Sequence, residues 1–233
     1  MPDTLDNILD NILNSYLAYT QDPQYVYKKC RDDYIVILRK PLFVNTNENR
    51  KSVKNPSYAK FRADRLEVVL IFNAIEPTNT VTTAYSIYDY DFKYEVGKLI
   101  NDTYDINSEV ICGQGIHYFK TIQAAYYYEI SPTMLTNHFG RYVRYHDNGN
   151  IHYSIEYGYM SENFMREDWD ENGNKIHERS CDGKNAYECN YENGNKTYEN
   201  ISNENIVNLY YYKDGNKTNV YQYKDGIFVA PTE

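Results

Sequence analysis

Cys112 and His117 are the residues of this 233-residue chain that most directly suggest catalytic chemistry, because they lie five apart in the segment Cys112-Gly-Gln-Gly-Ile-His117. A thiol nucleophile needs a base within about 3 Å. Residues at odd spacing on a strand point to opposite faces, although a bulge at Gly113 or Gly115 would change this register. No acidic partner for His117 is evident in the sequence. We therefore favour packing roles for both side chains and leave a ligand pocket and covalent catalysis open.

A second group of side chains could surround a pocket for an anion. The span from Lys28 to Arg65 holds eleven Lys or Arg and four acidic residues, so its local charge is 11 − 4 = +7. Such a span forms solvated loop and strand faces, or it attracts an acidic partner or a phosphate. The candidate binding residues of this region are Arg62, Arg65, Tyr88, Cys112, Gly115, His117 and Tyr118. We assign none of them a catalytic role, and expect convergence of Arg62, Arg65, Tyr88 and His117 on one cleft if the region binds a nucleotide or other ligand.

Two resemblances concern the same region. The blocks 61–66, 85–98 and 112–119 resemble an uncharacterised domain of Mimivirus-like giant viruses and of phages, often found beside MORN-type repeats. This likeness spans about residues 30–130 and implies a viral source without a settled activity. Gly115-Ile-His-Tyr-Phe followed by Ala124-Ala125-Tyr126 also resembles a stretch of ADP-ribosyltransferases, in which a strand leads into a short helix beside the nicotinamide. The key serine of that stretch is absent here, and no convincing catalytic glutamate follows, so the resemblance implies a degenerate version of that fold.

The C-terminal segment carries an internal repeat. Asn-Gly or Asp-Gly recurs at Gly149, Gly173, Gly194 and Gly215, with spacings of 24, 21 and 21 residues. These dipeptides favour type I′ hairpin turns, which need positive φ at both central residues. A second turn follows each of them by nine to eleven residues. The pattern predicts consecutive β-hairpins over about residues 140–228, and each unit is too short to bury a face without its neighbours.

The hairpin units resemble the variant MORN repeat, in which an aromatic residue precedes an Asn-Gly core. Aromatic and imidazole side chains recur four residues before or after the repeat glycines, and we expect them to form ladders across adjacent strands. These candidate surface-binding residues are Tyr145, Tyr153, Trp169, His177, Tyr198 and Tyr211. The third unit departs from the pattern, because Asn190 stands where an aromatic residue is expected.

The remaining elements predict an α+β fold that is β-rich overall. Residues 3–19 form an amphipathic pattern typical of a helix that Asp3 can cap, and we favour core packing of its apolar stripe over a dimer seam or a membrane-surface face. Strands are expected at 24–29, 34–39, 65–73, 83–88, 92–96 and 108–119, and a helix capped by Thr121 at 121–129. We predict an N-terminal helix at 1–20, an α+β domain at 21–137 and MORN-like hairpin repeats at 138–233.

The composition restricts the function classes. A net charge of −9 and a pI of about 5.1 disfavour nucleic-acid binding, which needs clustered cations. The four cysteines show no CxxC spacing, so we expect no metal site and no cofactor. The sequence has no basic region before an apolar core and no apolar stretch of membrane-spanning length. We expect a protein that is not secreted, that does not bind membranes and that resides in the host cytoplasm, a virus factory or a virion.

These observations lead to two functional hypotheses. The first is a non-enzymatic viral interaction protein whose Tyr-rich repeat sheet binds a host or viral protein, with homodimerisation through an open sheet edge as an additional prediction. The alternative is a nucleotide- or ligand-binding module, or an ADP-ribosyltransferase-like domain, in residues 30–130. We favour the first, because no convergent set of catalytic residues is apparent.

Overall fold

The computed structural model describes residues 4–132, 134, 139–158 and 163–229, which form two compact units. The N-terminal unit comprises residues 1–138 and 145–150, and the C-terminal unit comprises residues 139–144 and 151–233. The division thus falls beside the expected boundary at 138, except that the tip of the first hairpin belongs to the N-terminal unit. The N-terminal helical segment belongs to the first of these units.

The N-terminal helical segment contains α1 (Leu5–Ser15) and the single turn α2 (Leu17–Thr20). The cap of α1 is Thr4 and not the expected Asp3, because the Thr4 Oγ1 accepts a hydrogen bond from the Asn7 N–H at 3.1 Å. Leu5, Ile8 and Ile12 are buried, so the apolar stripe of α1 packs into the protein as predicted.

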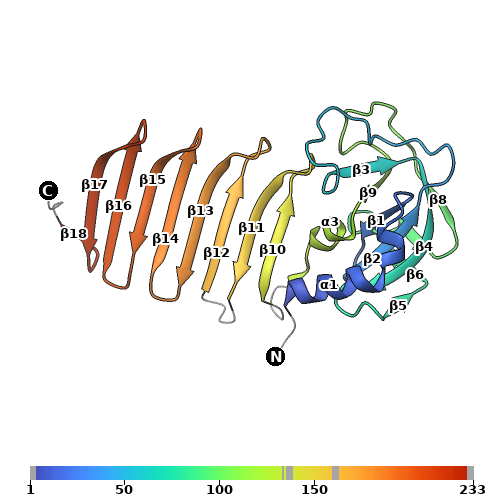
Figure 1. Ribbon diagram of the computed structural model, residues 1–233, viewed down its shortest axis with the longest axis horizontal. Coiled ribbons are helices and arrows are strands. Elements are labelled where there is room, and N and C mark those ends of the chain that lie inside the picture. Colours follow the sequence, from blue (N-terminus) through green and yellow to red (C-terminus); the bar gives the residue numbers. More distant parts are fainter. Residues whose placement is uncertain (1–3, 133, 135–138, 159–162, 230–233) are drawn as a thin grey trace. The chain divides into compact units, whose positions relative to one another are not determined.

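The N-terminal unit is built around an antiparallel sheet (Figure 1). Its strands are β1 (Tyr25–Lys29), β2 (Tyr34–Arg39), β3 (Lys60–Ala63), β4 (Arg65–Asn73), β5 (Thr80–Val81), β8 (Leu99–Asn101) and β9 (Ile116–Phe119). Within the described residues their order is β3-β9-β1-β2-β4-β5, and β8 pairs with β4. The β4 strand has the predicted bounds, and its apolar residues reach the core formed with β1, β2, β3 and β9.

Three expected strands are shorter than the sequence pattern indicates. A small hairpin contains β6 (Thr83–Tyr85) and β7 (Lys93–Glu95), and the residues between them form a loop. The strand expected at 108–119 is wrong over its first eight residues, since only β9 is extended and residues 108–115 form turns and bends. The following helix α3 (Ile122–Tyr127) begins after Thr121, whose Oγ1 accepts from the Ala124 N–H as expected.

The C-terminal unit is an antiparallel sheet in which the strands follow one another in chain order (Figure 1). Its strands are β10 (Gly140–Tyr145), β11 (Ile151–Tyr157), β12 (Asn163–Trp169), β13 (Lys175–Asp182), β14 (Ala186–Glu192), β15 (Asn195–Ser202), β16 (Ile206–Lys213), β17 (Asn216–Lys224) and β18 (Ile227–Val229). Within the described residues this gives a nine-stranded hairpin sheet, so the β-rich class and the hairpin array are confirmed.

The repeat glycines occupy two kinds of turn. Asn193-Gly194 and Asp214-Gly215 have positive φ at both residues, as a type I′ turn requires. At Gly149 and Gly173 only the glycine has positive φ, so the type I′ prediction is wrong for the first two repeats. There the Asp170 N–H donates to the Asn174 carbonyl and the Gly173 N–H to the Asp170 carbonyl, which closes a loop one residue longer. A three-residue loop of this kind ends on one left-handed residue, which glycine supplies.

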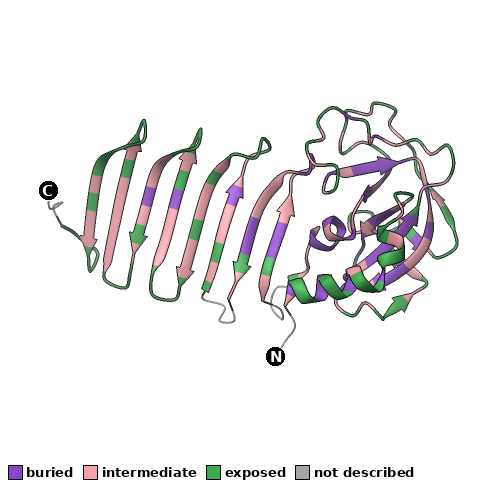
Figure 2. Cartoon of the chain, in the orientation of Figure 1, coloured by how far each residue is buried: buried purple, intermediate pink, exposed green. Residues whose placement is uncertain are grey.

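Burial differs along the sheet (Figure 2). Among the described residues, β10 and β11 contain buried side chains such as Tyr142, Val143 and Ile155, whereas β16, β17 and β18 contain none. The last three strands are therefore held in place by contacts between side chains on neighbouring strands and not by burial in a core.

Candidate functional site

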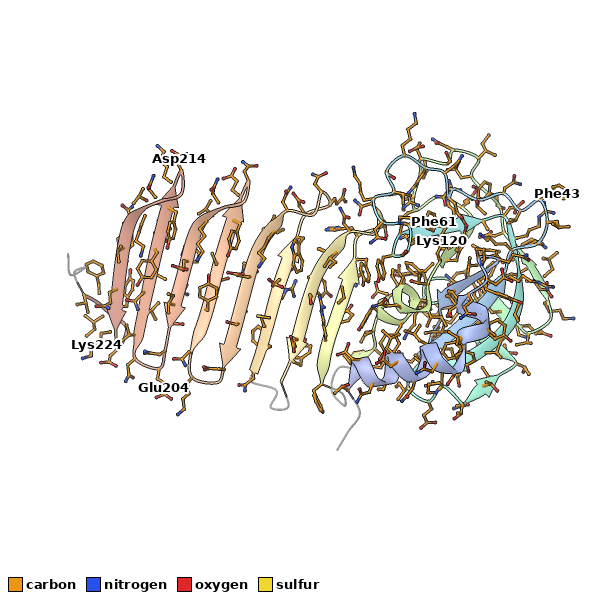
Figure 3. The ribbon with its side chains drawn as sticks, in the orientation of Figure 1. Phe43, Phe61, Lys120, Glu204, Asp214 and Lys224 are labelled. Atoms are coloured by element: carbon orange, nitrogen blue, oxygen red, sulfur yellow. The ribbon has the colours of Figure 1, made fainter. Side chains whose placement is uncertain are left out.

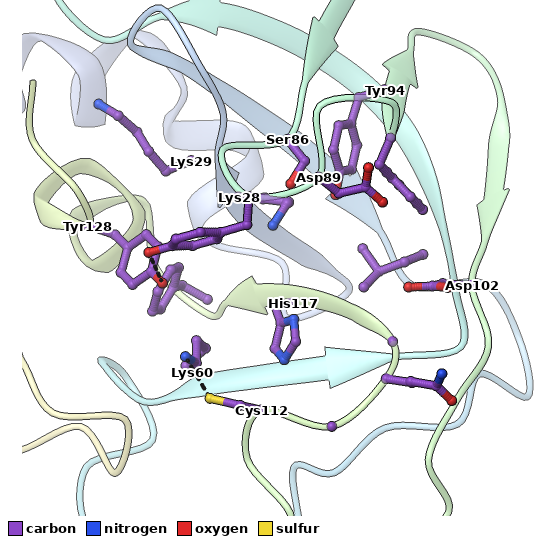
Figure 4. A pocket seen from close by; sticks show the side chains of 17 residues that line it. Lys28, Lys29, Lys60, Ser86, Asp89, Tyr94, Asp102, Cys112, His117 and Tyr128 are labelled. Atoms are coloured by element: carbon purple, nitrogen blue, oxygen red, sulfur yellow. Dashed lines mark hydrogen bonds between the residues drawn. The ribbon is translucent and has the colours of Figure 1, made fainter.

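A cavity of about 580 Å³ lies in the N-terminal unit and is lined by charged and aromatic side chains (Figure 4). The β1 strand contributes Lys28, β3 contributes Lys60 and β9 contributes His117 and Phe119. The loop between β6 and β7 adds Tyr88, Asp89 and Phe92, and the loop before β9 adds residues 112–115. Sheet strands thus form the floor and two loops form the walls.

The register of β3 and β9 determines which side chains reach the cavity. Lys60 pairs with Phe119 and Arg62 with His117, whereas Phe61 pairs with Tyr118. Because successive residues of a strand point to opposite faces, Lys60, His117 and Phe119 share the cavity face. Phe61 and Tyr118 point to the other face, where both are fully buried.

Lys28 is half-buried on the cavity floor, and its ammonium lies 5.8 Å from the centroid of the Tyr94 ring. Among the described residues, no carboxylate or other hydrogen-bond acceptor contacts this ammonium. Burial is the main cause that lowers the pKa of Lys28, and the charge of Lys60 acts in the same direction. The neighbouring Lys29, by contrast, pairs with Asp33 at 2.9 Å. Lys28 therefore places a cation without a countercharge in the cavity.

Lys60 lies at one side of the cavity with two partners. Its Nζ is 3.0 Å from Asp147 Oδ1 and donates to Cys112 Sγ at 3.4 Å. The Cys112 thiol is exposed and also lies 3.7 Å from Asp147 Oδ2. The charge of Lys60 is thus partly balanced, and the thiol marks the edge of the cavity beside it (Figure 4).

His117 is held as a neutral imidazole on the floor of the cavity. Its Nε2 lies 3.2 Å from the Ile111 carbonyl, which can only accept, so Nε2 carries the hydrogen and Nδ1 keeps its lone pair. Burial lowers the pKa of His117 to about 4, and the charges of Lys28 and Lys60 add to this effect. Nδ1 can accept a hydrogen bond, but so weak a base is a poor partner for activating the Cys112 thiol.

Arg62 is fully buried and does not line the cavity. Its guanidinium donates to the carbonyls of the loop before β9, and its Cζ lies 4.8 Å from the centroid of the Tyr104 ring. The acceptors are the backbone oxygens of Asp105 at 2.5 Å, Asn107 at 2.6 Å, Val110 at 3.0 Å and Gln114 at 3.0 Å. Arg62 therefore shapes the cavity wall from behind.

Gly115 completes that wall, with φ of +134°. A Cβ at this position would lie 3.0 Å from the Ala63 carbonyl oxygen, so the wall can approach β3 this closely only with glycine. The strand expected over residues 108–115 does not form, because the carbonyls of Val110 and Gln114 accept hydrogen bonds from Arg62, as do two carbonyls just before this segment.

The remaining predicted residues of this region divide between the cavity and other positions. Tyr88 lines the cavity, and its hydroxyl donates to Glu129 Oε1 at 3.0 Å. Arg65 lies elsewhere, where its Nη2 donates to the Phe43 carbonyl at 3.1 Å. Tyr118 donates to Glu48 Oε1 at 2.6 Å on the far face of β9. The structure thus brings Tyr88, Cys112, Gly115 and His117 together and leaves out Arg62, Arg65 and Tyr118.

The cavity also has an acidic part. Figure 4 shows Lys60 and Cys112 on one side of His117 and Asp102 on the other. Asp89 lines the cavity near Tyr94, and the charges of Asp102 and Asp89 contribute, after burial, to the raised pKa of the Tyr94 hydroxyl. The cavity therefore contains acidic as well as basic side chains.

A second candidate surface is the ladder face of the C-terminal sheet. Tyr153 pairs with Asp168, Asp168 with His177, His177 with Asn190, Asn190 with Tyr198, and Tyr198 with Tyr211. Side chains directly opposite in register share one face, so these six form one row. Its last two residues, Tyr198 and Tyr211, make an edge contact with ring centroids 5.4 Å apart, and Tyr211 makes a second one with Tyr221 of β17 at 5.9 Å.

Two of the predicted ladder residues lie elsewhere. Trp169 follows a register shift after Asp168 and pairs with Lys175. Because the turn at Gly173 contains one more residue than those at Gly194 and Gly215, the ladder position moves from the fourth to the fifth residue before the glycine. Tyr145 stacks on Tyr58 of the N-terminal unit, with centroids 4.3 Å apart.

The opposite face of the sheet carries a repeated cluster of Lys, Glu and Tyr. Lys175 and Tyr191 contact Glu178 at 2.9 and 2.5 Å, and Lys196 and Tyr212 contact Glu199 at 2.6 and 2.8 Å. Burial alone would raise the pKa of each glutamate, but these hydrogen bonds lower it below its ordinary value. The Lys-x-x-Glu pattern recurs after 21 residues, a sequence signal that is independent of the turn glycines.

The cavity residues missed from the sequence are mainly Lys28, Lys60, Asp89 and Asp102. The two lysines belong to the basic span, in which the sequence does not distinguish a lysine that lines a cavity from one exposed to solvent. No group of three or more His, Cys, Asp or Glu side chains able to hold a metal ion occurs in the described part of the chain. In the same residues, no helix is both long and apolar enough to cross a bilayer.

Residues 16–125 match the model of a family of unknown function (DUF5758). No curated protein and no solved structure matches the chain. The matched segment contains Lys28, Lys60, Cys112 and His117, so most of the cavity lies within the uncharacterised domain, and the hairpin sheet lies outside it.

Proposed function

We propose that this protein is a non-enzymatic interaction protein whose ladder face binds a protein partner. The observation that carries the proposal is the row of Tyr198, Tyr211, Tyr221 and Phe228, which contact one another across four adjacent strands. Tyr211 is 40% exposed, Tyr221 37% and Phe228 52%. Tyrosine offers a large contact area with little loss of side-chain entropy on binding.

The side chains along the sheet are drawn in Figure 3. On the ladder face, the surface changes from charged residues near Arg166 and His177 to aromatic residues at β16–β18. A partner would therefore meet a polar half and an aromatic half of one continuous surface, which favours a protein over a nucleic acid or a lipid bilayer. We further propose that the hairpins are variant MORN repeats, that the source is viral, and that the partner is a host or viral protein in the host cytoplasm.

A site-specific photo-crosslinker tests this proposal in the cells that naturally make the protein. Benzoylphenylalanine replaces Tyr221 on the ladder face or, as a matched control, Ile201, which is 43% exposed on the opposite face. We expect one defined protein to crosslink from position 221 and not from position 201. We also expect the double variant Tyr211→Ser/Tyr221→Ser to weaken its binding about a hundredfold, as loss of two aromatic hot spots does.

Equal crosslinking from both positions, or unchanged binding by the double variant, would contradict the proposal. Crosslinking to a second copy of the chain would instead identify the ladder face as a homodimer interface. Point substitutions are preferable to deletion from residue 138, because that deletion also removes Asp147, the partner of Lys60 in the N-terminal unit.

A further inference from the structure

We propose that the cavity of the N-terminal unit binds a small hydroxylated organic anion, with its acidic group at Lys28 and its hydroxyl groups toward Asp89 and Asp102. The cavity belongs to the N-terminal unit, whereas the ladder face belongs to the C-terminal unit. The inference starts from the juxtaposition of one cation without a countercharge, a neutral imidazole and two carboxylates around about 580 Å³ of space.

Lys28 is the group that would bind the acidic group of the ligand. An ammonium that is half-buried without a carboxylate partner is unfavourable, and an anionic ligand would relieve this cost. Lys60 strengthens the attraction, although Asp147 balances part of its charge at 3.0 Å. The Lys29 ammonium, paired with Asp33, is not available to a ligand.

His117 and the acidic residues determine which other groups the ligand must carry. The Nδ1 lone pair of His117 and the carboxylates of Asp89 and Asp102 all accept hydrogen bonds. A ligand that fits them must present donors, which hydroxyl groups do without adding charge. Phe92, Tyr94 and Phe119 provide apolar walls against which a carbon skeleton can pack.

Phosphate and carboxylate groups would satisfy Lys28 equally, so the experiment includes both. The full-length protein is titrated by calorimetry with glucose 6-phosphate, gluconate and inorganic phosphate. We expect glucose 6-phosphate or gluconate to bind with one site per chain, and inorganic phosphate to bind more weakly because it lacks the hydroxyl-bearing skeleton. The better of the two organic probes then identifies the acidic group.

Two variants separate the cavity from general surface charge. Lys28→Gln should weaken binding by at least about tenfold, the loss of one charge-assisted contact. Lys98→Gln removes an exposed lysine outside the cavity and should leave the affinity unchanged. Asp102→Asn should weaken the binding of the organic probe and not that of inorganic phosphate.

The exposed Cys112 provides a measurement on the unaltered protein. Its thiol lines the cavity beside Lys60, so a bound ligand should slow its alkylation by iodoacetamide, whereas Cys181 should react at an unchanged rate. Absence of binding by both organic probes, equal weakening by Lys28→Gln and Lys98→Gln, or unprotected Cys112 at saturating probe would each overturn the proposal.

Discussion

The two units of this protein are stabilised by different kinds of contact. In the N-terminal unit, strands β1, β2, β3, β4 and β9 surround a continuous core in which residues such as Phe61, Leu66 and Ile71 are fully buried. In the C-terminal unit, β16–β18 have no buried residue among those described, and neighbouring side chains contact along rows. A buried core makes each residue depend on many others, whereas a ladder depends on its nearest neighbours.

This difference has consequences for function. A sheet that leaves both faces partly exposed offers a long surface at the cost of weak local stability, since a cross-strand pair contributes only about 0.2–1 kcal/mol. An enclosed core can instead support a cavity with unfavourable charges such as that of Lys28, because the surrounding packing holds its walls in place. We therefore expect substitutions in the N-terminal unit to have large effects, and substitutions in the ladder to have small ones.

The largest effect is expected for Arg62→Leu. The substitution removes the four hydrogen bonds that Arg62 donates to backbone carbonyls and releases the loop before β9. We expect the free energy of unfolding to fall by about 3–5 kcal/mol, as when one partner of a buried charged network is removed. Urea denaturation followed by tyrosine fluorescence measures this change.

Arg65→Leu is the matched control, because the Arg65 side chain is 40% exposed and lies outside the cavity wall. It should cost less than about 1 kcal/mol. Similar losses for the two variants would show that Arg62 is no more important than a surface arginine, and the contrast between core and ladder would then lose its strongest case.

A smaller effect is expected from protonation of His117. Its folded-state pKa is about 4, below the ordinary value of 6.5, so the folded protein resists protonation more than the unfolded chain does. The associated stability is fully present above pH 6.5 and is lost as the pH falls toward 4, by up to about 3 kcal/mol. In His117→Asn this part of the pH dependence should disappear, as urea denaturation at several pH values would reveal. Parallel pH profiles for the two proteins would argue against a neutral His117 in the fold.

Some of these features were predictable from the sequence and others were not. The β4 strand, the Thr121 cap and the hairpin glycines follow from local rules, since hydrophobic runs, caps and positive φ depend on adjacent residues. The loop at 108–115 does not, because the side chain that binds its carbonyls is Arg62, more than forty residues earlier.

The candidate sites, too, were predictable only where their residues lie close together in the sequence. Cys112, Gly115 and His117 stood out because they are adjacent in sequence, whereas Lys28 and Lys60 join them only through the pairing of β1, β9 and β3. In the sheet, the register of Tyr153, His177, Tyr198 and Tyr211 follows from their equal offsets from the turns. Trp169 deviates because one extra loop residue moved the register, a difference that the shared Asn-Gly dipeptide conceals.

The smallest effect concerns the end of the Lys-Glu-Tyr cluster, and it has the opposite sign. Lys175 and Lys196 each contact a glutamate three residues later, whereas Lys217 is followed three residues later by Val220. The Lys217 ammonium instead lies 3.8 Å from the centroid of the Tyr210 ring. Val220→Glu should give Lys217 the missing carboxylate and stabilise the sheet by about 0.3–0.5 kcal/mol at low salt.

Val220→Gln is the matched control for this substitution, because it has the same length without the charge. The gain of Val220→Glu over Val220→Gln should shrink as salt is added, since the new pair is partly exposed to solvent. Urea denaturation at two salt concentrations measures the difference. If the glutamate and glutamine variants are equally stable at both salt concentrations, the charged contacts of the cluster do not stabilise the sheet. The aromatic rows of the ladder face must then stabilise it alone.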